Sequence, residues 1–191
     1  VGMQTNIDYL KAAEAKVWNE ANFDALTQLP NRRLFYDRLE MKLKQAQRER
    51  SLLALLFIDL DHFKEVNDTL GHHVGDELLG EAARRIQHTV RQCDTVARLG
   101  GDEFTVILAG VQTPASIAEV AQKIIQALAQ PFTLRHSESY MSGSVGIALY
   151  PADGLTVNDM VKNADQAMYA ATRAGRNRLQ FFTPPMYDAA L

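Results

Sequence analysis

The sequence predicts an α+β fold in which helices cover a central, mainly antiparallel β-sheet. Three observations lead to this class. The continuous apolar run Leu52 to Ile58 is typical of a strand buried on both faces of a sheet. The paired glycines Gly100 and Gly101 separate two short runs rich in β-branched and aromatic residues, as in a β-hairpin. Segments with helical spacing of apolar residues alternate with these strands.

Composition and charge exclude several functional classes. With 191 residues and 47% hydrophobic content, the chain can bury one sizeable core and still carry an appendage. The 20 basic and 23 acidic residues are spread along the chain, and no basic block marks a nucleic-acid binder. The single cysteine, Cys93, excludes an intrachain disulfide framework and fits a reducing cytosol. No apolar run could cross a bilayer and no signal peptide opens the sequence, so we expect a soluble, cytoplasmic segment.

The chain opens with a predicted helix over residues 1–22. Its apolar positions recur at spacings of three and four, at Ile7, Leu10, Ala13, Val17 and Ala21. The pattern is too thinly apolar to fold alone and starts abruptly at Val1. We therefore expect residues 1–23 to belong to a longer connecting helix, for example a coiled coil from an upstream domain. The alternative is an ordinary amphipathic helix that lies on the domain.

A turn and a second helix precede the central strand. The segment Asp24 to Arg33 contains Pro30, and proline disfavours helical backbone at the residue before it. The next helix is predicted from Arg32 to Glu49. Its inward positions are Leu34, Phe35, Leu39, Leu43 and Ala46.

Two carboxylates follow the central strand directly. Asp59 and Asp61 would share one face of a strand, because side chains alternate with period two. A buried carboxylate pair costs several kcal/mol unless it is neutralised, and a hard divalent cation is the usual remedy. The alternative is that Asp59 or Asp61 caps the turn that follows.

The remaining elements follow in a regular order. We expect a polar, functional loop over His62–Asp76, a helix over Val74–Val90, hairpin strands over Thr95–Leu99 and Phe104–Ala109, and a helix from Thr113-Pro114 to near Pro131. After these come a strand pair of Phe132–Leu134 with Tyr140–Tyr150, a helix capped by Thr156 and Asp159 and closed by Gly175, a short strand over Arg178–Phe182, and a tail from Pro184-Pro185. Gly143 and Gly146 indicate a bulge or a close approach.

This order gives the βαββαβ layout of a ferredoxin-like sheet. The first strand then lies beside the hairpin, so Asp59 and the Gly101-Asp102 turn approach each other. Carboxylates that converge beside a glycine turn, with Lys64 nearby, suit phosphoryl transfer at two metal ions. The residues thus indicate a magnesium-dependent nucleotide enzyme without naming its substrate. The alternative is that Asp102 and Glu103 simply point into water.

Several ordered motifs resemble the GGDEF domains of diguanylate cyclases. They are Asp24-Ala-Leu-Thr-Gln-Leu-Pro-Asn-Arg-Arg33, Asp59-Leu-Asp-His-Phe-Lys-Glu-Val-Asn-Asp68, Gly71-His-His-Val-Gly-Asp76, Arg98-Leu-Gly-Gly-Asp-Glu-Phe104, and Ala164-Asp-Gln-Ala-Met-Tyr169 with Gly175-Arg-Asn177. The resemblance covers about residues 24–182 and leaves 183–191 as a linker tail. It implies a nucleotide-cyclase, palm-like core with extra helices and a small peripheral strand pair.

The resemblance also implies an activity and a set of site residues. Two domains would face each other as a homodimer, each holding one GTP, and form cyclic di-GMP and two pyrophosphates. Asp59, the Leu60 carbonyl and Asp102 would hold two Mg²⁺ ions, with Mn²⁺ as an alternative. Asp102 or Glu103 would help to deprotonate the ribose 3′-hydroxyl.

The remaining substrate contacts follow from the same motifs. Asn67 and Asp76, with His72 close by, would read the guanine edge, which adenine cannot match. The triphosphate would meet Lys64, the amides of His62 and Phe63, the close-approach glycines Gly100 and Gly101, and Arg176. Arg176 alone would be a charge that complements the helix dipole.

Arg91 and Asp94 match the RxxD motif that binds product and inhibits in this family. Arginine can fork onto guanine O6 and N7 while aspartate takes the opposite edge. Without the family context, the two residues would be a surface ion pair.

Two positions depart from the family pattern. Thr172 stands where a phosphate-contacting lysine is usual, and Arg173 points about 100° away from it on the helix. Gln28 replaces a common glycine. A metal site at His72-His73 is rejected, because adjacent side chains diverge and the nearby acids suit Mg²⁺ better.

Three functions are weighed. The first is an active cyclase, and the second is a GTP- or cyclic-di-GMP-binding regulatory module. The stretch Phe181 to Leu191 resembles the link to a following EAL phosphodiesterase domain, and we expect a sensor domain upstream, so the whole protein could be membrane-anchored. The third function, an adenylate-type cyclase or polymerase-like palm, would need base-reading residues other than Asn67 and Asp76.

Overall fold

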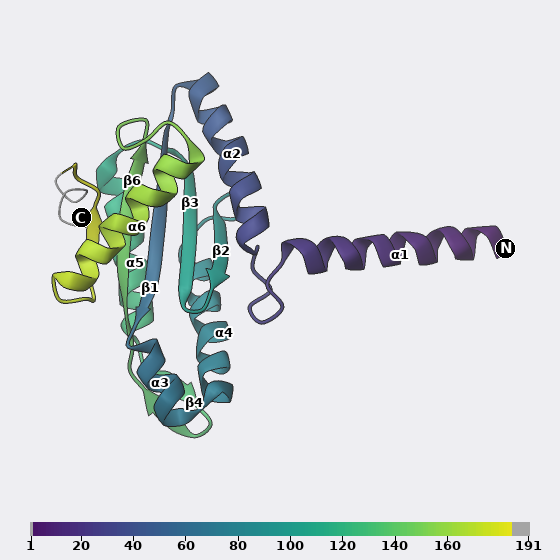
Figure 1. Ribbon diagram of the computed structural model, residues 1–191, viewed down its shortest axis with the longest axis horizontal. Helices are drawn as coiled ribbons and strands as arrows, with labels where there is room; N and C mark the ends of the chain where they lie inside the picture. The colour runs from purple at the N-terminus through teal and green to yellow at the C-terminus, as the bar shows by residue number, and fades with distance from the viewer. Residues whose placement is uncertain (1, 185–191) are drawn as a thin grey trace.

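The computed structural model describes residues 2–184 of the chain. Within this range a five-stranded sheet, in the order β2-β3-β1-β6-β7, forms the centre (Figure 1). Its strands are antiparallel to their neighbours except β7, which is parallel to β6. The strands are β1 (Leu52–Asp61), β2 (Thr95–Gly100), β3 (Glu103–Val111), β6 (Ser142–Tyr150) and β7 (Leu179–Phe181). This arrangement confirms the predicted α+β class and the βαββαβ core.

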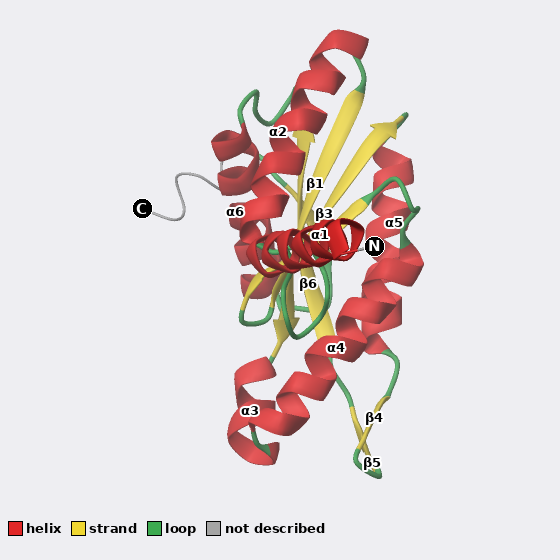
Figure 2. Ribbon diagram, turned by 90° about the vertical axis from the view of Figure 1, so that its right-hand side faces the viewer, coloured by secondary structure: helices red, strands yellow, loops and turns green. Residues whose placement is uncertain are grey.

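Helices cover both faces of the sheet. They are α1 (Gly2–Asn22), α2 (Arg32–Glu49), α3 (Phe63–Leu70), α4 (His72–Thr89), α5 (Pro114–Ala129) and α6 (Val157–Arg173). Figure 2 shows α2 and α6 on one side and α4 and α5 on the other. Alternate residues of β1 serve the two layers: Ala54, Leu56 and Ile58 belong to the core under α4 and α5, whereas Leu53, Leu55 and Phe57 belong to the core under α2 and α6. Asp59 continues the second set.

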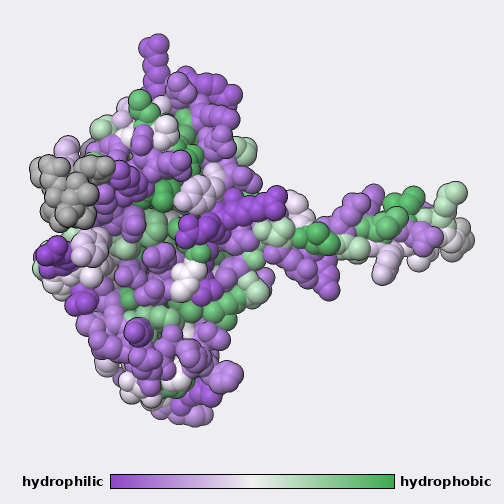
Figure 3. Space-filling view, in the orientation of Figure 1, coloured by the Kyte–Doolittle hydropathy of each residue, from purple (hydrophilic) through white to green (hydrophobic). Residues whose placement is uncertain are grey.

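Helix α1 projects away from the domain as a separate rod (Figure 1). The helix predicted over residues 1–22 is therefore confirmed for Gly2–Asn22, and the alternative of a helix lying on the domain is not the arrangement seen. Only Asn22 is buried. Apolar residues lie in the open along the rod, as Figure 3 shows; they include Met3, Ile7, Leu10, Val17 and Trp18.

The prediction of a loop over His62–Asp76 is wrong. Helix α3 and the first turn of α4 occupy this segment, and Gly71 separates them with a φ of 91°. Phe63 is buried, and Val66 and Val74 pack against the same core. These few apolar contacts hold two helical turns whose polar neighbours hid the helical pattern in the sequence.

The predicted pairing of Phe132–Leu134 with Tyr140–Tyr150 is also wrong. Strand β4 (Phe132–Leu134) pairs with β5 (Ser137–Ser139) in a separate two-stranded sheet, so the small peripheral strand pair is confirmed with a different partner. β6 instead pairs with β1, because it is buried on both faces. The close approach expected at Gly146 is confirmed: a Cβ there would collide with the main chain of Ala164 and Met168 in α6.

Other local predictions are confirmed. The Gly100-Gly101 hairpin joins β2 to β3. Thr113 and Thr156 cap α5 and α6 by accepting hydrogen bonds from the amides of Ser116 and Asp159, at 3.2 and 3.1 Å. Most of the predicted 183–191 tail lies outside the described residues. Among the described helices, none is long and apolar enough to cross a membrane.

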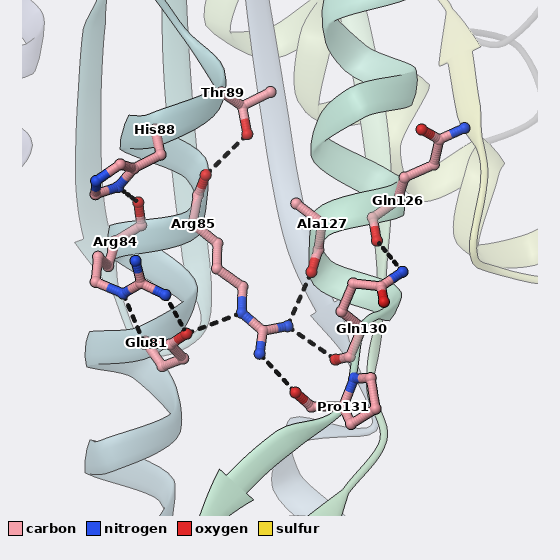
Figure 4. Close-up of polar contacts among 9 residues, drawn as sticks. All are labelled: Glu81, Arg84, Arg85, His88, Thr89, Gln126, Ala127, Gln130 and Pro131. Atoms are coloured by element: carbon pink, nitrogen blue, oxygen red, sulfur yellow. Dashed lines mark hydrogen bonds and ion pairs between the residues drawn. The ribbon is translucent and has the colours of Figure 1, made fainter.

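Arg85 joins α4 to the end of α5 (Figure 4). Its guanidinium donates to the carbonyls of Ala127, Gln130 and Pro131 at 2.7–2.8 Å and lies 3.8 Å from the centre of the Phe132 ring. Glu81 accepts from Arg84 and Arg85, and these bonds lower its pKa to about 2. A side chain from α4 thus binds the last turn of α5 and the two residues that follow the helix.

Candidate active site

The acidic residues of the central strand and the hairpin turn come together at one end of the sheet. Asp59 of β1 lies opposite Glu103 of β3, and the Leu60 amide donates to the Asp102 carbonyl at 3.4 Å. Gly100 and Gly101 have φ angles of 145° and 51°, which favour glycine and allow the tight turn. The approach of Asp59 to the turn follows from the topology, as predicted.

Asp59 and Glu103 hold their protons more tightly than usual. Burial, followed by a hydrogen bond with the Asp102 carboxyl, raises the pKa of Asp59 to about 8. Burial and the negative charges of Asp165 and Asp102 raise the pKa of Glu103, with partial compensation by Arg32. The sequence analysis did not single out Asp165, since its place beside Glu103 depends on how α6 packs. Within the described residues, Arg32 offsets only part of the negative charge around Glu103.

The Asp61 side chain makes hydrogen bonds to β6 and to the loop after α6. Its carboxylate accepts hydrogen bonds from the hydroxyls of Ser142 and Ser144 on β6, at 2.5 and 2.7 Å, and from the Asn177 amide at 3.1 Å. It neither caps the following turn, which was the alternative considered, nor adds a free oxygen to the Asp59–Asp102 pair. Both of its oxygens are occupied because β6 and the loop after α6 close around it.

A partly buried ion pair between Arg98 and Asp24 supports the glycine turn. Arg98 donates to Asp24 at 2.8 Å and to the Gly101 carbonyl at 3.0 Å, and its amide donates to the Pro30 carbonyl. Burial opposes ionisation of Asp24, but hydrogen bonds from Thr27 and Arg98 outweigh it and lower its pKa. Sequence reasoning missed this contact, because the partners are 74 residues apart.

Helices α3 and α4 carry the residues predicted to bind substrate. His62 has a φ of 63° and stands directly before α3, without a side-chain cap of the first amides. Phe63 is buried, and Lys64 is exposed. Gly75 has no Cβ in the space where the Asn67 side chain lies, and this brings Asn67 next to the helical turn that carries Asp76. His72 and Asp76 are exposed at the start of α4.

The loop after α6 carries Arg176, which is exposed. Its amide donates to the Ala171 carbonyl at 3.1 Å, and the next amide is the one held by Asp61. The Thr172 hydroxyl donates to the Met168 carbonyl at 3.2 Å, whereas the Arg173 guanidinium lies 5.8 Å from the centre of the Tyr169 ring.

Arg91 and Asp94 lie at the other end of the hairpin. The guanidinium donates to both Asp94 oxygens, at 3.1 and 3.0 Å, and to the Ala109 carbonyl at 2.9 Å. Ala109 is six strand residues from Glu103, so this pair is about 20 Å from the glycine turn. Grooves of 360 and 430 Å³ flank the pair, and the first also touches Phe23 and Gln28. The ion-pair alternative is therefore the state seen, at the border of two grooves.

The predicted metal ligands suit a hard cation by their chemistry. Two carboxylates, Asp59 and Asp102, and a main-chain carbonyl are oxygen donors, which Mg²⁺ prefers. Burial and the neighbouring Asp102 raise the pKa of Asp59, and a bound cation would favour its ionised form. Among residues 2–184, no group of three or more His, Cys, Asp and Glu side chains is arranged to hold a metal ion. The predicted ligand set has only two such side chains.

Comparison with known proteins adds the family. Residues 21–178 match the family model described as "Diguanylate cyclase, GGDEF domain". The chain belongs to the GGDEF family. The bifunctional diguanylate cyclase/cyclic di-GMP phosphodiesterase MucR of Pseudomonas aeruginosa is 49% identical over 177 residues, which are 93% of this chain and 26% of MucR. The diguanylate cyclase TpbB of the same species is 43% identical over 87% of this chain and 39% of TpbB.

Solved structures of GGDEF domains have the same fold. The GGDEF domain of TpbB from Pseudomonas aeruginosa matches with a TM-score of 0.86 and 42% identity, covering 88% of this chain and 98% of that one. The coiled coil and GGDEF domain of DgcB from Caulobacter crescentus, in complex with c-di-GMP, matches with a TM-score of 0.86 and 28% identity, covering 94% and 95%. The chain spans roughly a quarter to two fifths of the full-length relatives cited above.

Proposed function

We propose that this GGDEF domain is a diguanylate cyclase, which condenses two GTP molecules into cyclic di-GMP and two pyrophosphates. The observation that carries the proposal is the meeting of Asp59 with Asp102 beside an intact Gly100-Gly101 turn. Relatives named as diguanylate cyclases support it. Each domain holds one GTP, and two copies face each other, so that both phosphodiester bonds form at their interface.

Each residue has a defined role in this reaction. Asp102 or Glu103 accepts the proton of a ribose 3′-hydroxyl, and the raised pKa of Glu103 suits a base. The 3′-oxygen then bonds to the α-phosphorus of the other GTP as the bond to pyrophosphate breaks. Asp59, the Leu60 carbonyl and Asp102 would hold two Mg²⁺ or Mn²⁺ ions, which when bound neutralise phosphate charge and lower the hydroxyl pKa.

Helices α3 and α4 bind and select the nucleotide. Asn67 and Asp76, which Gly75 allows to lie on adjacent turns, accept and donate at the guanine edge, with His72 beside them. Lys64, the amides at the start of α3 and Arg176 hold the triphosphate. Arg91 and Asp94 exchange their mutual ion pair for bonds to cyclic di-GMP, which inhibits the enzyme.

A second function is supported by one observation. Thr172 turns its hydroxyl to the Met168 carbonyl and supplies no positive charge for phosphate. A domain with weak triphosphate affinity would serve as a GTP- or cyclic-di-GMP-binding regulatory module. Relatives that combine cyclase and phosphodiesterase names are compatible with such a role.

A turnover assay separates the two functions. Wild-type protein and Asp102→Ala are incubated with GTP and Mg²⁺ at high protein concentration, because the site needs two copies. Product from wild type alone supports the cyclase, whereas tight GTP binding without product supports the regulatory module. In parallel, unchanged cyclic-di-GMP affinity in Arg91→Ala would reject the inhibitory site.

The wider protein is part of the same proposal. We propose that residues 1–23 connect to an upstream sensor domain, that 24–182 form the cyclase unit, and that 183–191 lead towards an EAL domain. A solved structure from an EAL/GGDEF domain protein of M. capsulatus, 50% identical over 81% of this chain, supports the pairing with an EAL domain. The unit itself would work in the cytoplasm without nucleic acid, in a whole protein that could be anchored to the membrane.

A further inference from the structure

The buried carboxylate of Asp61 has no part in the chemistry proposed above. Asp61 is 3% exposed. Oδ1 accepts from the Ser144 hydroxyl, and Oδ2 accepts from the Ser142 hydroxyl and the Asn177 amide. All three donors are uncharged, and burial of a charge is unfavourable unless its hydrogen bonds are well made. A buried acid at this position therefore depends on these three hydrogen bonds.

The segment that Asp61 holds has an unusual backbone. Gly175, Arg176 and Asn177 have φ angles of 123°, 65° and 50°. Two successive left-handed residues that are not glycine are strained, and such a conformation persists only where its surroundings impose it. The Ala171 carbonyl fixes the Arg176 amide from α6, and Asp61 fixes the Asn177 amide from β1.

This anchor also joins the loop to the acidic end of the sheet. Asp61 is two residues beyond Asp59 on the same face of β1, and its partner Asn177 directly follows Arg176. The exposed Arg176 side chain is thus tied, through one hydrogen bond and one residue of chain, to the strand that carries the proposed metal ligand.

We propose that Asp61 is a positioning residue, whose buried carboxylate fixes the 175–177 backbone so that Arg176 reaches the nucleotide phosphates. The inference rests on the proposed binding of GTP and would explain why a carboxylate, and not an apolar side chain, stands at this position. Asp61 does not ligate a metal ion in this role, because its oxygens are taken by the serine hydroxyls and the amide.

A double-mutant cycle on GTP affinity tests the role. Affinity of the full chain for a non-hydrolysable GTP analogue with Mg²⁺ is measured for wild type, Asp61→Asn, Arg176→Ala and the double variant. Asparagine keeps the shape but puts an N–H₂ group or a weaker acceptor opposite the Asn177 amide. We expect Asp61→Asn to weaken binding about tenfold, the size of one charge-assisted hydrogen bond. The double variant should bind no more weakly than Arg176→Ala alone. Independent, multiplicative losses would overturn the proposal.

Amide hydrogen exchange gives a readout that does not depend on activity. The Asn177 amide should exchange faster in Asp61→Asn and at the wild-type rate in Arg176→Ala. Ser142→Ala removes only the hydroxyl that shares Oδ2, and this milder variant should show smaller changes of the same kind. Asp8→Asn on α1 is the matched control and should change neither measurement.

The outcomes separate this inference from the proposed function. If wild type binds the analogue but forms no product from GTP, the cyclase fails while the affinity cycle still tests Asp61. If wild type forms product and folded Asp61→Asn binds as tightly as wild type, the inference fails alone. If wild type binds no analogue at all, both are rejected.

Discussion

Replacing Asp59 by asparagine should stabilise the domain in metal-free buffer while it abolishes the proposed activity. The pKa of Asp59 is about 8 in the folded chain, against an ordinary value of 3.8. Above pH 4 the unfolded chain releases this proton more readily than the folded chain. The free energy of unfolding therefore falls as the pH rises towards 8, and the loss is complete above that value.

The structure limits the size of this gain. The interval between 3.8 and about 8 sets a ceiling of roughly 6 kcal/mol. Asp59 is only half-buried, so solvent screening reduces the effect, and we expect about 1–2 kcal/mol. For a chain of this size that corresponds to a rise in Tm of about 2–8 °C. At pH 5 most of the gain should vanish, because the folded chain then keeps its proton and only the interval between 3.8 and pH 5 contributes to the destabilisation of wild type.

Thermal unfolding in EDTA, at pH 5 and pH 8.5, measures the effect, with Asp8→Asn as an exposed control. Added Mg²⁺ should raise the Tm of wild type and leave Asp59→Asn unchanged, because the cation replaces the proton in neutralising the acid pair. A variant that is less stable than wild type at pH 8.5, or a gain that is equal at both pH values, would refute the electrostatic reasoning.

Three further substitutions test contacts that stabilise the fold, and chemical or thermal unfolding measures the stability of each variant. Arg85→Ala should lower the free energy of unfolding by about 3 kcal/mol, because three carbonyls and Glu81 lose a largely buried guanidinium. Arg85→Lys should recover only part of this loss, since an ammonium group cannot reproduce the planar guanidinium. Full recovery of stability with lysine would contradict this reasoning. Gln28 has a φ of 61°, so Gln28→Gly should stabilise by about 0.5–1 kcal/mol, whereas the same change at Gln45 within α2 should destabilise. Gly146→Ala should lower the free energy of unfolding by about 3 kcal/mol or more, because the added Cβ would collide with α6. Gly80→Ala is the control, since a Cβ there meets open space, and it should be neutral or stabilising. Equal effects of the two substitutions would disprove the close packing at Gly146.

The sequence alone was sufficient where one physical signal dominates a segment. The apolar run of β1, the paired glycines of the hairpin and the caps at Thr113 and Thr156 each depend on neighbours close in the chain. They are found where they were expected. Topology then brought Asp59 to the turn, because the layout fixes which strands are adjacent.

The failures have a common physical cause. Helix α3 is held by contacts of Phe63 and Val66 with a distant core, and its own sequence reads as polar. Asp61 binds the Asn177 amide, 116 residues away, and Arg98 binds Asp24, 74 residues away. Local spacing carries no information on such pairs, so motifs could mark these residues but not say what they touch.

The edges of the sheet have a consequence for how copies of this domain meet. β2 is the outer strand on one side, and β7, with three residues, is the outer strand on the other. An edge strand with unpaired main-chain groups can pair with a strand of another chain, which is a common route to aggregation. Here the Pro30 carbonyl occupies the Arg98 amide, and a bridge from Phe23 to Pro30 lies alongside. Copies of the concentrated domain should therefore not add a strand beside Arg98 of β2.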